Sequence, residues 1–256
     1  FDAANFPVIA GRLLGSGLAT LHKTLPLSGL GSAPGLAWLH RGVPWVMQVH
    51  KPGPGLLATI SPANYQTLRI LQTQEDLSQR LDVIKKMWQP KCVIHGDIKS
   101  DNILLVAPGG ETNALGIRLV DWETIQIGDP AWDVAGALQD FILFWISSMP
   151  VGIGSPDEMV RNAMYPLASI QAAIRAFWRA YRGASALTQA EADALLIRAV
   201  QFSAARLIQS AYEIAQNSQV LPATSVLILQ IGSNILAGPE MAQVQLFGVF
   251  QEVSVQ

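Results

Sequence analysis

Apolar residues recur at helical spacing over the first part of the chain. Between residues 5 and 25 this spacing predicts one buried helix that ends near His22, although the segment GRLLGSG within it is rich in glycine. From Pro26 to Pro54, glycine and proline recur every few residues, which predicts a long irregular loop. We expect three large apolar side chains to hold this loop on the body of the protein: Trp38, Trp45 and Met47.

Two later helices have recognisable start signals. Ser61 and Pro62 combine a hydroxyl cap with a proline in the first turn, and predict a helix that runs to about Trp88. Thr188 and Glu191 have the spacing of a capping box at the start of a long helical repeat. Most of the chain after residue 130 has the same helical character.

Short strands are predicted only in the centre of the chain. The runs KCVIH, NILLV and GIRLVDW are apolar and short, and a Gly109-Gly110 turn separates the last two. Helices, a few central strands and further helices predict an α+β fold that is mainly α, with a small central β-hairpin. We expect one domain over residues 1–256, and a doubly wound sheet is disfavoured because strands and helices do not alternate at length.

Composition restricts the partners of this chain. Half of the 256 residues are hydrophobic and 14% are charged, against roughly a quarter in a typical soluble domain. This deficit suggests that something outside the chain covers part of its apolar surface. The formal net charge of −2 gives no reason to expect a nucleic-acid groove or a basic membrane-binding face.

The location is expected to be cytoplasmic. A single cysteine, Cys92, cannot form an intrachain disulfide, which favours a reducing compartment. The most apolar run, residues 141–154, is interrupted by two serines and a proline and is too short to span a bilayer, which needs about 20 apolar residues. The first residues lack the pattern of a signal peptide.

The polar segment between the first two strands carries the candidate chemistry. In VIHGDIKSDNILL, Asp97 and Asn102 flank a loop just before a strand, and Asp121 ends the next strand. A hairpin would bring these three side chains together. Carboxylate and amide oxygens are ligands that Mg²⁺ prefers, and a second carboxylate could accept a proton from a hydroxyl group. These are the parts that phosphoryl transfer requires.

The same residues carry a resemblance to a known family. The segment HGDIKSDN ends at Asn102, and 18 residues separate it from a second segment, DWETIQIGDPAWD, which begins at Asp121. Together the two segments resemble the paired signatures of the aminoglycoside phosphotransferase and choline kinase family. The C-terminal lobe of that family is similar to the C-terminal lobe of protein kinases. GRLLGSGLATLH is also similar to the helix that opens this lobe, so the resemblance runs from about Gly11 to the end of the chain.

The resemblance implies a role for each matching residue. Asp97 would be the catalytic base, with Lys99 near the transferred phosphate. Asn102 and Asp121 would hold Mg²⁺ against the phosphates of ATP. Two further residues would support the catalytic loop: His95 and Asp133. We expect His95 to be a hydrogen-bonded structural residue rather than a proton shuttle, because Asp97 already supplies the base.

A small-molecule acceptor is favoured over a protein acceptor. Only 11 residues separate Asp121 from Asp133, too few for a folded activation segment, and position 96 is glycine where protein kinases usually have arginine. The implied reaction is transfer of the ATP γ-phosphate to a hydroxyl group of a small molecule of the aminoglycoside, choline, sugar or amino-acid-derivative type.

The nucleotide-binding N-terminal lobe is expected to be absent from this chain. GRLLGSG lies in a helical pattern, and no strand lysine of the Val-Ala-x-Lys kind follows it, so we reject it as a phosphate-binding loop. That lobe or another chain would cover apolar surface. The second hypothesis is a regulatory or binding module that kept the lobe and lost turnover.

Several assignments stay open. Two interpretations of Glu123 are equally supported: it binds a second metal ion or a cationic substrate, or it is a solvated surface carboxylate. The carboxylates considered for binding an amine acceptor are Asp157, Glu158, Glu191 and Asp193. Six aromatic residues are interpreted as core rather than as an acceptor pocket: Phe141, Phe144, Trp145, Phe177, Trp178 and Tyr181.

Overall fold

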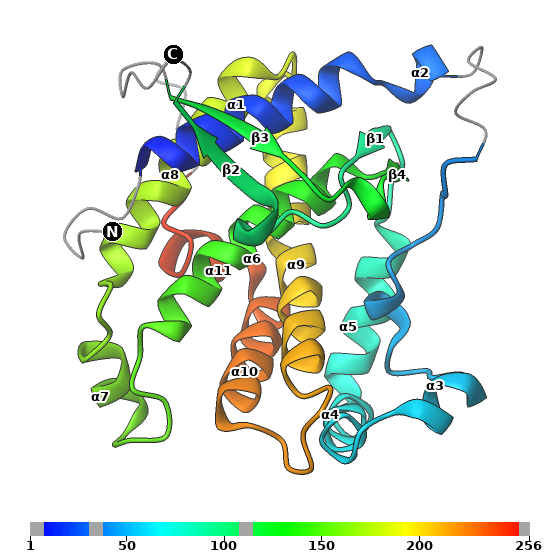
Figure 1. Cartoon of the computed structure of the whole chain (residues 1–256), viewed down its shortest axis with the longest axis vertical. Coiled ribbons are helices and arrows are strands. Elements are labelled where there is room, and N and C mark those ends of the chain that lie inside the picture. Colours follow the sequence, from blue (N-terminus) through cyan, green and yellow to red (C-terminus); the bar gives the residue numbers. More distant parts are fainter. Residues whose placement is uncertain (1–7, 31–37, 108–114, 251–256) are drawn as a thin grey trace.

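The computed structural model describes residues 8–30, 38–107 and 115–250. In the described part the protein is mainly helical, with short antiparallel strands near one end (Figure 1). The helices before the strands are α1 (Val8–Thr24), α2 (Leu27–Leu30), α3 (Pro54–Thr59), α4 (Pro62–Thr73) and α5 (Glu75–Lys86). Those after them are α6 (Pro130–Ser147), α7 (Pro156–Arg161), α8 (Leu167–Ala184), α9 (Gln189–Ile214), α10 (Ala223–Ala237) and α11 (Pro239–Gln245). This composition confirms the prediction of a mainly α protein with a few central strands.

Four strands form two separate ladders. β1 (Cys92–Ile94) pairs with β4 (Gln126–Gly128), and β2 (Ile103–Val106) pairs with β3 (Gly116–Leu119), both antiparallel. The predicted hairpin is therefore β2 and β3, with Ile103 opposite Leu119. The Gly109-Gly110 turn lies outside the described residues. The polar loop, residues 95–102, connects the two ladders and enters the hairpin at its β2 end.

Glycines in α1 allow close helix packing. α1 lies along α8, and a Cβ atom at Gly11 would approach the carbonyl oxygen of Ala173 to 2.6 Å. A side chain at Gly15 would collide with the carbonyl oxygen of Phe177 in the same way. The segment GRLLGSG is thus helical, as predicted from its apolar spacing, and its glycines at these two positions serve helix contact.

The predicted helix from Ser61 to Trp88 is in fact two helices. The start is confirmed, since Ser61 Oγ accepts a hydrogen bond from the N–H of Asn64 at 3.0 Å. The helix breaks at Gln74, whose φ of −89° and ψ of 87° leave the helical region. Leu71 and Leu77, both buried, are six residues apart and would not share one face of a straight helix. The break lets both helices turn an apolar face to the core.

The loop from Pro26 to Pro54 is only partly as predicted. Met47 is fully buried, in a short 3-10 helix, η2 (Trp45–Gln48), and Trp45 stacks edge-on against Tyr212 with ring centroids 5.2 Å apart. Trp38 is 70% exposed, so the expectation that it holds the loop on the body is wrong. Its neighbours 31–37 are outside the described residues.

The long helices α6 and α9 form the centre of the core. They pack against each other, and α9 also packs on α10 (Figure 1). The capping box predicted at Thr188 and Glu191 starts α9. In the described part, no helix is long and apolar enough to cross a membrane.

A buried ion pair joins the ends of several elements. Asp129 caps α6 by accepting a hydrogen bond from the N–H of Ala131 at 3.0 Å, and it also accepts one from the N–H of Gln89. Its carboxylate pairs with Arg198 of α9 through Nε and Nη2 at 2.8 and 3.1 Å. The segment after α5, the start of α6 and the middle of α9 therefore meet at one carboxylate.

Candidate active site

The polar loop has a backbone shape that only glycine fits at one point. Gly96 has a φ of +87°, and a Cβ atom there would lie 2.5 Å from the carbonyl oxygen of Thr124. Thr124 Oγ1 donates a hydrogen bond to the carbonyl oxygen of His95, and Trp132 Nε1 donates one to that of Gly96, both at 2.9 Å. Arginine, which protein kinases usually carry at this position, would need a different loop.

Asp133 fixes the loop through its backbone. Its carboxylate accepts hydrogen bonds from the N–H groups of His95 and Gly96 at 2.8 and 2.9 Å. His22 Nε2 lies 3.1 Å from the same carboxylate, and Tyr181 Oη lies 2.8 Å from His22 Nδ1. The contacts of Asp133 are those expected of a residue that supports the loop.

His95 links the loop to the end of the hairpin. Its Nε2 lies 2.9 Å from the carbonyl oxygen of Val120, and its Nδ1 lies 3.3 Å from the N–H of Asp97. The geometry fits an imidazole that donates from Nε2 and accepts at Nδ1. Its ring packs on Trp122 at 4.6 Å between centroids. With both nitrogens hydrogen-bonded and the side chain buried, His95 is placed to brace the loop.

Asp97 is surrounded by donors. Oδ1 accepts a hydrogen bond from Arg206 Nη2 at 3.0 Å, and Oδ2 lies 2.6 Å from Lys99 Nζ. The side-chain amide of Asn102 donates to the carbonyl oxygen and to Oδ2 of Asp97 at 2.9 and 3.2 Å. Burial raises the pKa of Asp97, but Arg206 and Lys99 outweigh burial, so the pKa lies below its ordinary value.

Arg206 is a site residue that the sequence reasoning missed. It lies on α9, 109 residues from Asp97, and also donates to the carbonyl oxygen of Ile98 at 3.1 Å. Its guanidinium lies 5.4 Å from the ring centroid of Trp132. The sequence did contain a signal, because Arg206 lies in the otherwise apolar stretch SAARLI. An arginine buried in such a stretch requires an anionic partner elsewhere in the protein.

Removing the Arg206 charge should raise the pKa of Asp97. In Arg206→Gln, burial would remain while the strongest opposing charge is lost, so the carboxylate would protonate at a higher pH. Carbon NMR titration of the Asp97 carboxyl group measures this directly. Arg206→Lys keeps the charge and should move the pKa less. An unchanged pKa in Arg206→Gln would contradict the assigned pairing.

Asn102 and Asp121 are brought together as the hairpin predicted. The N–H of Val120 donates to the carbonyl oxygen of Asn102 at 3.0 Å, which places Asp121 beside the loop. Asp121 is exposed and has a φ of 62°, the only positive φ of a non-glycine residue in the described part. Such backbone strain is commonest at functional sites.

The donor set fits a Mg²⁺ ion that also binds phosphates. The side-chain nitrogen of Asn102 is used by Asp97, which leaves its oxygen available as a ligand. Asp121 has no hydrogen bond or ion pair to the described residues. Two protein oxygens suit Mg²⁺, which usually keeps waters and takes phosphate oxygens as further ligands. Glu123 is exposed in the adjoining turn, η6 (Trp122–Thr124), and both of its alternatives stay open.

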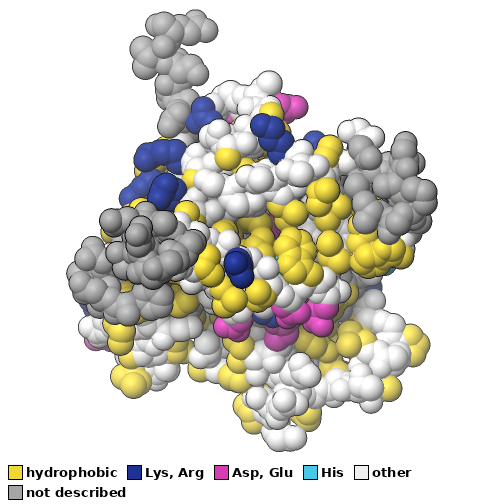
Figure 2. All heavy atoms as spheres, turned by 45° about the horizontal axis from the view of Figure 1, so that its top comes forward, with side chains coloured by type: hydrophobic (Ala, Val, Ile, Leu, Met, Phe, Trp, Pro, Cys, Tyr) yellow, Lys and Arg dark blue, Asp and Glu magenta, His cyan; other side chains and the backbone are white. Residues whose placement is uncertain are grey.

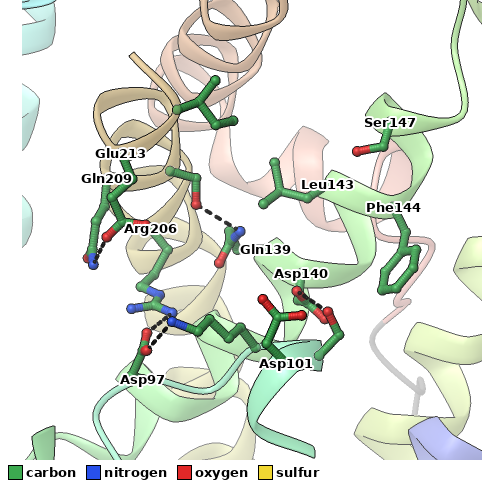
Figure 3. Close-up of a pocket in the computed structure, with 14 residues that line it drawn as sticks. Asp97, Asp101, Gln139, Asp140, Leu143, Phe144, Ser147, Arg206, Gln209 and Glu213 are labelled. Atoms are coloured by element: carbon green, nitrogen blue, oxygen red, sulfur yellow. Dashed lines mark hydrogen bonds and ion pairs between the residues drawn. The ribbon is translucent and has the colours of Figure 1, made fainter. Parts of the chain in front are cut away.

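A cavity of about 380 Å³ lies in front of Asp97. It is lined by residues of the polar loop, α6 and α9, Lys99 among them. Figure 3 shows Asp97 and Arg206 at one end, with Leu143 and Phe144 along a wall. We call this the acceptor cavity. Its lining includes four residues that the sequence reasoning did not single out: Asp101, Gln139, Asp140 and Glu213. Phe144 lines it too, whereas the other five aromatic residues are buried, as predicted for core.

The carboxylates considered from sequence for an amine acceptor lie elsewhere. Glu158 and Glu191 form capping boxes with Ser155 and Thr188, and Asp193 accepts a hydrogen bond from Gln189. Neither these three nor Asp157 line the acceptor cavity. Capping explains the two glutamates better than ligand binding does, because their carboxylates already hold backbone N–H groups.

Comparison of the sequence with models of known families gave a match. A sequence model of the phosphotransferase enzyme family matches residues 5–154, more than half of the chain. The match contains the polar loop, the hairpin and α6, and it ends before α8 and α9. A search of curated proteins gave no match.

Proposed function

Because the chain belongs to the phosphotransferase enzyme family, we propose that it transfers the γ-phosphate of ATP to a hydroxyl group of a small molecule. It would do so as the C-terminal lobe of a protein-kinase-like fold. The observation that carries the proposal is the position of Asp97, at one end of the acceptor cavity and bonded to Asn102 beside the end of the hairpin. ATP as donor favours a cytoplasmic location, as does the buried thiol of Cys92.

In this mechanism Asp97 orients the acceptor hydroxyl group. Oδ1 accepts one hydrogen bond from Arg206 and keeps a lone pair for the hydroxyl proton. A carboxylate with a lowered pKa is a weak base, so it would take the proton late, when the new P–O bond has largely formed. That order suits a loose phosphoryl-transfer transition state, in which positioning supplies most of the catalysis.

The remaining polar groups would manage charge. Asn102 and Asp121 would hold Mg²⁺, which when bound neutralises charge on the phosphate oxygens. Lys99, whose pKa is raised by its hydrogen bond to Asp97, keeps a positive charge beside the base. From there its ammonium can stabilise negative charge on the arriving phosphoryl group.

The face above the site would receive the nucleotide-binding lobe. Figure 2 shows hydrophobic side chains gathered at the centre of this face, with acidic side chains beside them. Leu104 of β2 is 48% exposed, and Trp122 is 37% exposed. Apolar groups so close to the site are expected to be covered, either by an upstream segment of the protein or by another chain.

A small acceptor is supported by the segment between Asp121 and Asp133. These residues form η6, β4 and the first turn of α6. η6 and the first turn of α6 hold the polar loop, and β4 pairs with β1, so each element already has a partner within the lobe. This favours the small-molecule reaction over protein phosphorylation.

The test is acceptor-dependent ATP consumption by the complete protein with Mg²⁺. The acceptor panel would contain hydroxylated amines, sugars and aminoglycosides, with a protein acceptor added. We expect at least one small molecule to raise turnover, and Asp121→Asn to lower that turnover about 100-fold or more by weakening Mg²⁺ binding. Mg-ATP binding without turnover on any acceptor would favour the binding-module hypothesis, and absence of both would refute the proposal.

A further inference from the structure

A second, apolar cavity adjoins the acceptor cavity. It measures about 240 Å³ and lies between α1, β2 and α6. Its lining is largely apolar and includes Leu14, Ile103, Leu105, Phe141 and Phe144. An apolar cavity of about 150 Å³ is enough to bind benzene. The space beside the site is therefore large enough for an aromatic ring or a branched alkyl group.

Asp140 stands where the two cavities meet. Ser100, Asp140 and Phe144 line both of them, so the two cavities are neighbours along α6. Among the described residues Asp140 has no ion pair, and its carboxyl group accepts hydrogen bonds from Ser100, through Oγ at 3.4 Å (Figure 3) and through the backbone N–H. Arg206 attracts Asp140 but is bonded to Asp97.

The carboxyl group of Asp140 is costly for the folded protein to ionise. Burial raises its pKa to about 6. The folded protein then holds a proton that the unfolded chain has lost, so folding stability falls as the pH rises from about 4 to about 6. A buried acid with a raised pKa beside a cavity is often functional, and a bound cation would lower the pKa of Asp140 again.

We propose that the acceptor is an amino alcohol with an aromatic or branched apolar group. Its ammonium group pairs with Asp140, its apolar group fills the second cavity, and its hydroxyl group reaches Asp97. The inference rests on the proposed function, because it names the acceptor of that reaction.

The charges around the acceptor cavity favour a cation. Lys99 and Arg206, the positive groups in its lining, are both bonded to Asp97. Asp101, Asp140 and Glu213 are left without an ion pair to the described residues. α1 brings only Ala10, Gly11 and Leu14 to the apolar side, none of them charged. A polyhydroxylated sugar would leave the apolar cavity unfilled. An amine with an apolar group would instead pair with the carboxylates of the acceptor cavity and fill the apolar cavity.

Binding to the complete protein without nucleotide tests the inference. Calorimetry would compare 2-amino-3-phenyl-1-propanol with ethanolamine, which lacks the ring, and with 3-phenyl-1-propanol, which lacks the amine. We expect the first compound to bind at least tenfold more tightly than either of the others. Equal affinity for ethanolamine would refute the apolar half of the site, and equal affinity for 3-phenyl-1-propanol would refute the ammonium half.

Variants test which residues bind the ammonium group and which bind the apolar group. Asp140→Asn should weaken binding of the amino alcohol tenfold or more and leave 3-phenyl-1-propanol unaffected. Asp101 lines the acceptor cavity but not the apolar cavity. Asp101→Asn therefore removes one negative charge from the acceptor cavity alone, and should change the affinity for the amino alcohol less than threefold. Ala10→Leu fills the apolar cavity from its rim and should abolish the advantage of the phenyl group. Equal effects of Asp140→Asn and Asp101→Asn would mean general attraction and would overturn the assignment.

Two readouts separate this inference from the proposed function. Asp140→Asn should raise the unfolding midpoint at pH 7, with the gain shrinking toward pH 4, which also shows that the variant folds. Because binding is measured without ATP, an inactive protein can still satisfy the inference. Turnover on sugars without binding of the amino alcohol would refute the inference and leave the phosphotransfer reaction standing.

Discussion

Asp97→Asn is expected to lower kcat by a factor of about 10² to 10⁴, the usual contribution of a positioned general base. The amide can still accept a hydrogen bond at its oxygen, but it cannot take the proton of the acceptor hydroxyl group. KM for the acceptor should change much less, because the walls of the cavity on α6 and α9 are untouched. Steady-state kinetics with the best acceptor of the panel measures both values.

The variant should lose stability, because the buried guanidinium of Arg206 loses an anionic partner, but it should remain folded. Arg206 keeps its hydrogen bond to the carbonyl oxygen of Ile98 and its contact with the Trp132 ring when the charge at position 97 is lost. Asp157→Asn is the matched control: it removes one carboxylate from the exposed start of α7, outside the cavity, and should leave kcat within about twofold. A kcat of Asp97→Asn within tenfold of the parent protein would show that this carboxylate is not the base.

Arg198→Met is expected to cost about 3–5 kcal/mol of folding free energy, because it leaves the fully buried carboxylate of Asp129 without its cation. Two backbone N–H groups still reach that carboxylate, but they do not neutralise it. The loss is a large fraction of the 5–15 kcal/mol typical of a folded domain. Urea unfolding followed by circular dichroism gives the difference.

A surface pair provides the control for this prediction. Lys51→Met breaks the ion pair with Asp82, in which the lysine side chain is 63% exposed, and should cost at most about 1 kcal/mol. Asp129→Asn added to Arg198→Met removes the stranded charge while keeping a residue that can cap α6, and should recover part of the stability. Similar losses in Arg198→Met and Lys51→Met would show that burial of the Asp129 pair does not matter.

The sequence by itself determined the local parts of this protein. Ser61 and the pair of Thr188 and Glu191 start helices where they were predicted, because a cap requires only residues within one turn. The polar loop and the hairpin that carries Asp121 were also predictable, since the strands on both sides are adjacent in the chain. The family resemblance rested on these same contiguous segments, which is why the family match confirmed it.

Only the tertiary structure decided what surrounds Asp97. Arg206 reaches it from α9 across 109 residues, and no local pattern sets that pairing. Asp140 became a boundary between two cavities because α1, α6 and the loop pack together there. The break at Gln74 arises in the same way, since no proline or glycine marks it and the burial of two apolar faces requires it. Local free energies determine where elements begin, whereas packing between distant elements decides which side chains share a cavity.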